Sequence, residues 1–132
     1  MPETTVYFYR EESGESPFLD WFRELDTRDE RAANACMVRI QLLAAMGREL
    51  RRPHADLLRE GIYELRAKVG RVNYRILYFF HGRNIAILAH GLTKEDAVPE
   101  AHIQRAIDRK LEYEKDPETH RTTLDLERDR DS

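Results

Sequence analysis

Arginines stand among aromatic and β-branched residues in the middle of this chain, between Gly61 and Lys94. Arg66 and Arg75 lie in two successive apolar runs, and Lys94 follows the third run. A guanidinium has a permanent charge and a fixed fork of donors, which suits it to grip a phosphate. RNA can be cut without a metal when its 2′-hydroxyl attacks the adjacent phosphate and cations neutralise the developing charge. The segment therefore predicts a surface that holds and cuts RNA.

Arg75 has two interpretations. It lies in the run Val72–His81, where neither alternating set of side chains is polar, so we expect a central and buried strand. A buried arginine costs free energy unless it is paired or functional. One interpretation is a structural salt bridge to Glu64 or another carboxylate, and the other is a phosphate clamp that stabilises a cleavage transition state.

His90 is the candidate for proton transfer among the histidines. In a regular strand it shares a side with Leu88 and Leu92, and it lies close to Lys94 in the sequence. The alternative is a partly buried histidine whose hydrogen bonds are satisfied within the fold. The residues do not identify the general base.

The charge distribution points to the same region. The chain has a net charge of −3, yet residues 39–83 hold 10 basic and 4 acidic side chains, a net of +6. A basic region inside an acidic protein can build a phosphate-binding face, and the alternative is a solvated arginine-rich surface. The candidate RNA-binding residues are Arg51, Arg52, His54, Lys68 and Arg71.

Other chemistries have little support. The histidines show no H-x-x-x-H spacing, so we expect neither a metal nor another cofactor. Cys36 is the single cysteine, which excludes an intrachain disulfide, and its apolar neighbours predict a buried side chain. No apolar stretch approaches 18 residues, and we expect no signal peptide, no membrane contact and a cytoplasmic location.

The spacing of apolar residues predicts the elements that carry these side chains. We expect a strand at Val6–Glu11, a helix from Ser16 and Pro17, a second helix from the capping-box spacing of Thr27 and Glu30 to Gly47, a basic connector at Arg48–Glu60, strands at Ile62–Val69, Val72–His81 and Ile85–Leu92, and a helix from Pro99 to Glu114. The order β-α-α-β-β-β-α predicts a two-layer α+β domain, an antiparallel sheet with helices on one face.

The apolar pattern fades after Glu114. We therefore divide the chain into a folded domain at residues 1–114 and a charged, flexible C-terminal tail at residues 115–132.

The succession YELR, YRILYFF and HGLTK before a helix that begins with proline resembles the HigB branch of the RelE/ParE toxin superfamily, the toxins of type II toxin–antitoxin modules. The resemblance covers roughly Val6 to Glu114. It implies a RelE-like α+β domain and ribosome-dependent, metal-independent cleavage of translated mRNA, which blocks translation. It also implies that Arg66, Arg75 and Lys94 line the RNA-facing surface, and that a cognate antitoxin, a helix-turn-helix protein, is the partner besides ribosome and mRNA.

Two other functions remain open on the same fold, because fold does not fix function. One is a non-enzymatic toxin of the ParE kind that inhibits gyrase, whose signature would be a DNA-damage response. The other is a degenerate member that only binds a partner protein.

Overall fold

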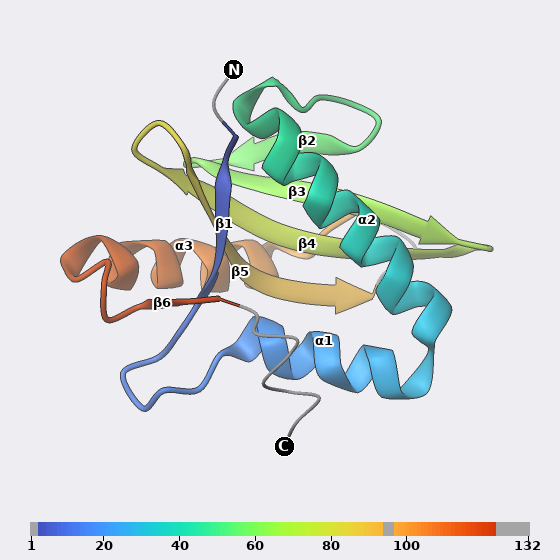
Figure 1. The fold of residues 1–132 in the computed structure, drawn as a ribbon, viewed down its shortest axis with the longest axis horizontal. Helices are drawn as coiled ribbons and strands as arrows, with labels where there is room; N and C mark the ends of the chain where they lie inside the picture. The colour runs from blue at the N-terminus through green and yellow to red at the C-terminus, as the bar shows by residue number, and fades with distance from the viewer. Residues whose placement is uncertain (1–2, 94–96, 124–132) are drawn as a thin grey trace.

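The computed structural model describes residues 3–93 and 97–123, in which three α-helices cover a six-stranded sheet. The elements in chain order are β1 (Thr5–Tyr9), α1 (Pro17–Arg28), α2 (Glu30–Met46), a 3₁₀ turn η1 (Gly47–Glu49), β2 (Ala55–Arg59), β3 (Ile62–Val69), β4 (Val72–His81), β5 (Ile85–Thr93), α3 (Glu100–Lys115) and β6 (Arg121–Thr122). The strands lie in the order β2-β3-β4-β5-β1-β6 (Figure 1). The expected α+β class is confirmed.

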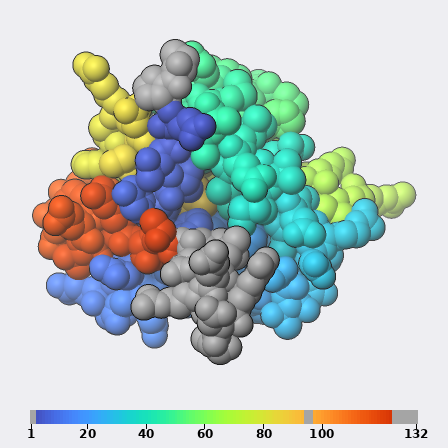
Figure 2. Space-filling view, in the orientation of Figure 1, coloured from blue at the N-terminus to red at the C-terminus, as the bar shows by residue number. Residues whose placement is uncertain are grey.

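The three strands expected in the middle of the chain form two hairpins, β3–β4 and β4–β5. Gly70 makes the first tight turn with a φ of 62°, a value that a residue without a Cβ adopts at little cost. This hairpin projects beyond the helices at the right of Figures 1 and 2. Strand β4 is buried from Tyr74 to Phe79, as expected for the central strand.

Helices cover both faces of the sheet, so the expectation of helices on one face is wrong. Helices α1 and α2 pack in front of the sheet in Figure 1, and α3 packs behind it. The cluster under α1 and α2 takes Ile76 and Tyr78 from β4, whereas the cluster under α3 takes Leu77 and Phe79. Both faces are covered because successive side chains of β4 alternate between faces and all four are apolar.

The sheet is mixed rather than antiparallel, which is a second correction. Strand β1 runs parallel to β5, with Thr5 opposite Ile85. Strand β2 lies inside the expected connector and pairs with β3, and β6 pairs with β1. These two strands could not be predicted from the sequence. β2 carries two charges in five residues, and β6 has only two residues, so neither shows a strand pattern.

The first part of the expected tail is packed against the domain. After α3 the chain turns back, and Arg121 pairs with Tyr9 in the sheet. The His120 ring is buried and stacks on Tyr9 at 5.6 Å between centroids, while its Nδ1 lies 2.8 Å from the Arg10 carbonyl oxygen. Within the segment expected as a tail, His120 and Arg121 therefore contact β1. Residues 124–132 lie outside the described residues.

The helix starts differ from the expected caps. Ser16 precedes α1, but its hydroxyl donates to the Tyr9 carbonyl oxygen at 2.8 Å and makes no cap hydrogen bond. Helix α2 begins at Glu30, and Asp29 caps it by accepting a hydrogen bond from the Ala32 N–H at 3.2 Å. The expected capping box does not form, because Thr27 is still part of α1.

A bulge in β5 changes which side chains share a face. The pairing of β5 with β4 passes from Leu88 directly to His90, so Ala89 is an extra residue. Leu88 belongs to the cluster under α1 and α2, whereas Leu92 belongs to the cluster under α3. The expectation that Leu88, His90 and Leu92 share one side is therefore wrong.

Gly91 marks a close approach between β5 and α1. A Cβ at Gly91 would lie 2.3 Å from Cε3 of Trp21, whose ring rests against Phe18 at 5.7 Å between centroids. We expect Gly91→Ala to lower the free energy of unfolding by about 2 kcal/mol, because the added methyl would displace the Trp21 ring from its packing against Phe18. Urea unfolding followed by circular dichroism measures the change.

The matched control replaces Trp21, the side chain that the added methyl would meet. In a Trp21→Leu background, the added methyl of Gly91→Ala should cost much less than in the wild-type background. An equal cost in both backgrounds would contradict the proposed clash.

Candidate functional site

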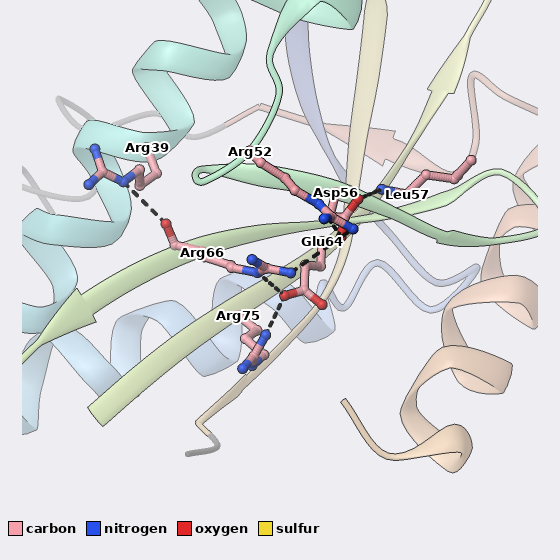
Figure 3. Close-up of polar contacts among 7 residues, drawn as sticks. All are labelled: Arg39, Arg52, Asp56, Leu57, Glu64, Arg66 and Arg75. Carbon is pink, nitrogen blue, oxygen red and sulfur yellow. Dashed lines mark hydrogen bonds and ion pairs between the residues drawn. The ribbon is translucent and has the colours of Figure 1, made fainter. Parts of the chain in front are cut away.

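Glu64 lies between two arginines that project from the α3 side of the sheet. It is 2% exposed, and its Oε1 accepts hydrogen bonds from Nη1 of Arg75 and Nε of Arg66 (Figure 3). The register explains the contact, because Arg66 on β3 lies opposite Arg75 on β4, and Glu64 is two residues along the same side of β3. The salt bridge to Glu64, one of the two interpretations of Arg75, is therefore present.

The network continues to the edge of the sheet. Asp56 on β2 lies 3.5 Å from Nη2 of Arg66 and 2.9 Å from Nη2 of Arg52. The hydrogen bond from Arg52 is the main cause that holds the pKa of Asp56 below its usual value. Three arginines thus share two carboxylates, and the network of Arg52, Asp56, Glu64, Arg66 and Arg75 has a formal charge of +1. Figure 3 shows it running from Arg75 to Arg52.

Arg75 keeps one donor unused. Its Nε is buried and has no hydrogen-bond partner in the structure as described. A buried N–H without an acceptor costs free energy, and an anion that displaced its surroundings and reached it would recover that cost. Arg75 also lines a pocket of about 490 Å³, called here the strand pocket, whose lining is Leu58, Glu64, Arg66, Asn73, Arg75, Ala97 and Val98.

The structure does not bring His90 into the strand pocket. His90 lies under α3, where Nη1 of Arg109 is 3.0 Å from its Nδ1 and Nδ1 of His102 is 2.7 Å from its Nε2. Arginine can only donate, so Nδ1 of His90 is an acceptor and its proton lies on Nε2. Burial, followed by the charge of Arg109, lowers the pKa of His90 to about 3. His90 is therefore neutral and fully engaged.

The other predicted residues are spread around this site. Lys68 and Arg71 are exposed on the projecting β3–β4 hairpin. His54 is half-buried just before β2, and its carbonyl oxygen accepts the Arg66 N–H at 2.8 Å. Arg51 and Arg52 line a second pocket of about 630 Å³, called here the edge pocket, whose lining is Arg48, Leu50, Arg51, Arg52, Ala55, Asp56, Leu57 and Tyr63. Lys94 lies outside the described residues.

Sequence reasoning missed several members of the network. Glu64 entered only as a partner of Arg75, although it holds Arg66 as well. Asp56 and Arg39 were not considered, yet Asp56 joins Arg52 to Arg66 and Nε of Arg39 donates to the Arg66 carbonyl oxygen at 3.1 Å. The i, i+2 spacing of Glu64 and Arg66 was the available signal. Asp56 gave none, because β2 was not recognised as a strand.

Residues 3–93 and 97–123 contain neither a candidate metal site nor a candidate membrane-spanning helix. No group of three or more His, Cys, Asp and Glu side chains there could hold a metal ion. No helix in these ranges is long and apolar enough to cross a membrane.

Comparison with known families assigns the chain. A family model described as "Phage derived protein Gp49-like (DUF891)" matches residues 20–111, which include both arginines and Glu64. The protein belongs to this Gp49-like family. The family is RelE-like and toxin-like, it is associated with toxin–antitoxin modules, and it implies an antitoxin as partner. A search of curated proteins finds no match.

Removing the Glu64 charge should destabilise the protein. We expect Glu64→Gln to lower the free energy of unfolding by about 3 kcal/mol, because the buried Arg75 guanidinium loses its counter-ion. Asp56→Asn is the matched control at the exposed end of the network and should cost less than about 1 kcal/mol. Guanidinium unfolding at neutral pH compares the two, and equal costs would contradict the role given to Glu64.

His90 should make the protein sensitive to mild acid. Its pKa is depressed in the folded state, so below pH 6.5, the usual pKa of histidine, the unfolded chain binds a proton that the folded chain does not. The contribution of neutral His90 to the free energy of unfolding is fully present above pH 6.5, and it is lost progressively as the pH falls towards about 3. Thermal unfolding between pH 7 and 5 should therefore show a weaker pH dependence for His90→Gln than for the wild type, and parallel profiles would contradict this.

Proposed function

We propose that this protein is the toxin of a type II toxin–antitoxin module, of the HigB kind, and that it cuts mRNA on translating ribosomes in the cytoplasm. The reaction is metal-independent and needs no cofactor. The observation that carries the proposal is the strand pocket, in which Arg66 and Arg75 are held by a single carboxylate and Nε of Arg75 lacks an acceptor. Membership of a toxin-like family supports it.

The proposed chemistry begins with attack of an RNA 2′-oxygen on the neighbouring phosphorus. The 2′-hydroxyl gives its proton to water as it attacks, the phosphorus–O5′ bond breaks, a 2′,3′-cyclic phosphate forms, and the O5′ leaving group takes a proton from water. Charge builds up on the phosphate oxygens in the transition state, and preorganised cations there lower the barrier. Arg75 donates through its free Nε, and Arg66 adds a second guanidinium at the mouth of the pocket.

The two arginines are fixed before any substrate arrives. Each bond to Glu64 orients a guanidinium that would otherwise lose rotamer freedom on binding. Lys94, which follows β5, is the further cation of this proposal, on the ground of the resemblance to HigB toxins. His90 has no place in it, because both its ring nitrogens are engaged under α3.

One observation favours a second candidate, a toxin-like protein that binds its target without cutting RNA. Glu64 already neutralises one positive charge in the strand pocket, which weakens the attraction for a phosphate. Such a protein would act through a bound partner, either gyrase or another protein.

The first experiment maps mRNA 5′ ends in bacteria after brief induction of the protein. A reporter transcript is compared with the same transcript lacking its start codon. We expect new 5′ ends in the translated reporter alone. Growth arrest without cuts and with a DNA-damage response would favour the gyrase-binding candidate, and neither effect would favour a protein that only binds a partner.

The second experiment asks whether Arg75 takes part in cleavage. Arg75→Lys keeps a positive charge beside Glu64, and so protects the fold, but loses Nε as a donor in its present place. We expect the cleaved fraction of the reporter to fall about 100-fold, the typical effect of losing one donor to a transition-state oxyanion. Arg31→Lys, at an exposed arginine near the start of α2, is the matched control. Undiminished cleavage by a folded Arg75→Lys protein would remove Arg75 from the mechanism.

A further inference from the structure

The edge pocket lies on the other face of the sheet from the strand pocket. Tyr63 lines the edge pocket and Glu64 lines the strand pocket, and as neighbours in β3 they point to opposite faces. Both pockets border β2, the outermost strand of the sheet. A ligand that occupied both would have to pass around this five-residue strand.

The rim of the edge pocket is positively charged. Arg48, Arg51 and Arg52 line it, with Asp56 as the acidic residue of the lining, which leaves a formal charge of +2. Arg48 donates to the Gly82 carbonyl oxygen at 2.8 Å, and Arg51 donates to the Arg48 carbonyl oxygen. These acceptors are neutral, so the contacts orient the two guanidinium groups without cancelling their charge.

Aromatic side chains pack next to these arginines. The half-buried Tyr63 ring stacks on Tyr78 at 5.4 Å between centroids and meets Phe80 edge-on at 5.2 Å. The Arg48 guanidinium lies over Phe80, 4.4 Å from its centroid. Proteins bind single-stranded nucleic acid by combining two features. Cationic side chains contact the phosphate backbone, and an aromatic ring beside them stacks on a base.

The geometry points to the edge pocket as a binding site for single-stranded RNA, one that takes a phosphate on Arg48 and Arg51 and a base on Tyr63. This inference rests on the proposed function and adds the path of the RNA away from the strand pocket. The two pockets are connected through Asp56, which lines the edge pocket and is also paired with Arg66 of the strand pocket. In Figure 3, Arg52 and Asp56 stand at one end of the network and Arg75 at the other.

A protein strand added to the edge of β2 fits this surface less well. The Leu57 N–H already donates to its neighbour Asp56 Oδ1 at 3.0 Å, so a ladder hydrogen bond there would have to displace it. An acidic protein segment is nevertheless the rival occupant that the experiment has to separate from RNA.

The test measures binding of a fluorescein-labelled, 2′-O-methylated 12-nucleotide single strand by fluorescence anisotropy across a salt series. We expect the double variant Arg48→Ala/Arg51→Ala to bind more weakly. The negative slope of log affinity against log salt should become shallower by about 1.4, which corresponds to two lost phosphate contacts at about 0.7 each. The matched control is Arg28→Ala/Arg31→Ala, which removes two exposed arginines near the junction of α1 and α2 and should leave the slope unchanged.

Two further measurements identify the occupant. Tyr63→Leu should weaken RNA binding about fivefold or more through the lost stacking, and should leave binding of a labelled poly-glutamate peptide unchanged. If poly-glutamate competes with RNA as effectively as unlabelled RNA does, the pocket takes an acidic protein segment and the inference is wrong. Unchanged RNA affinity and slope in Arg48→Ala/Arg51→Ala, or no RNA binding by the wild type, would also overturn it. Cleavage of the reporter in cells, measured separately, reports on the proposed function in each case.

Discussion

The buried Glu64 carboxylate is the interaction on which the charged part of this sheet depends. Without it, Arg75 would be an unpaired cation in the central strand, and two arginines would face each other across β3 and β4. With it, both guanidinium groups are fixed next to a pocket. The same contact thus makes a basic sheet compatible with folding and gives it a defined geometry.

This arrangement sets a balance between stability and binding. Glu64 accepts one hydrogen bond from each arginine, while Nε of Arg75 has no acceptor and Arg66 remains about one-third exposed. Incomplete satisfaction of a buried network lowers stability and leaves capacity for another anion. The free donor is therefore more informative about binding than the number of positive charges in the region.

The sequence was sufficient to predict the elements with strong local patterns. The alternation of apolar residues predicted β3, β4 and β5, and the apolar side chains on both faces of β4 predicted its central position. The salt bridge of Arg75 was one of two interpretations that the sequence left open. The location of α3 could not be predicted, because its apolar face is equally compatible with either side of the sheet. Nor could the bulge at Ala89, which depends on pairing rather than composition and moves His90 under α3. Strands β2 and β6 are stabilised by their neighbours and carry no clear pattern of their own.

The position of β1 has a consequence for how the chain is made. β1 is made before its parallel partner β5, which begins 80 residues later with Ile85 opposite Thr5. On its other edge, Phe8 and Tyr9 pair with β6 at residues 121–122. Contacts this distant in sequence form slowly, since a long loop must close before they can contribute. The pairing of β1 with β5 therefore waits for residues 85–88, and the edge of β1 at Phe8 and Tyr9 stays open until residues 121–122 follow. A chain that stopped between these two segments would expose an unpaired strand edge.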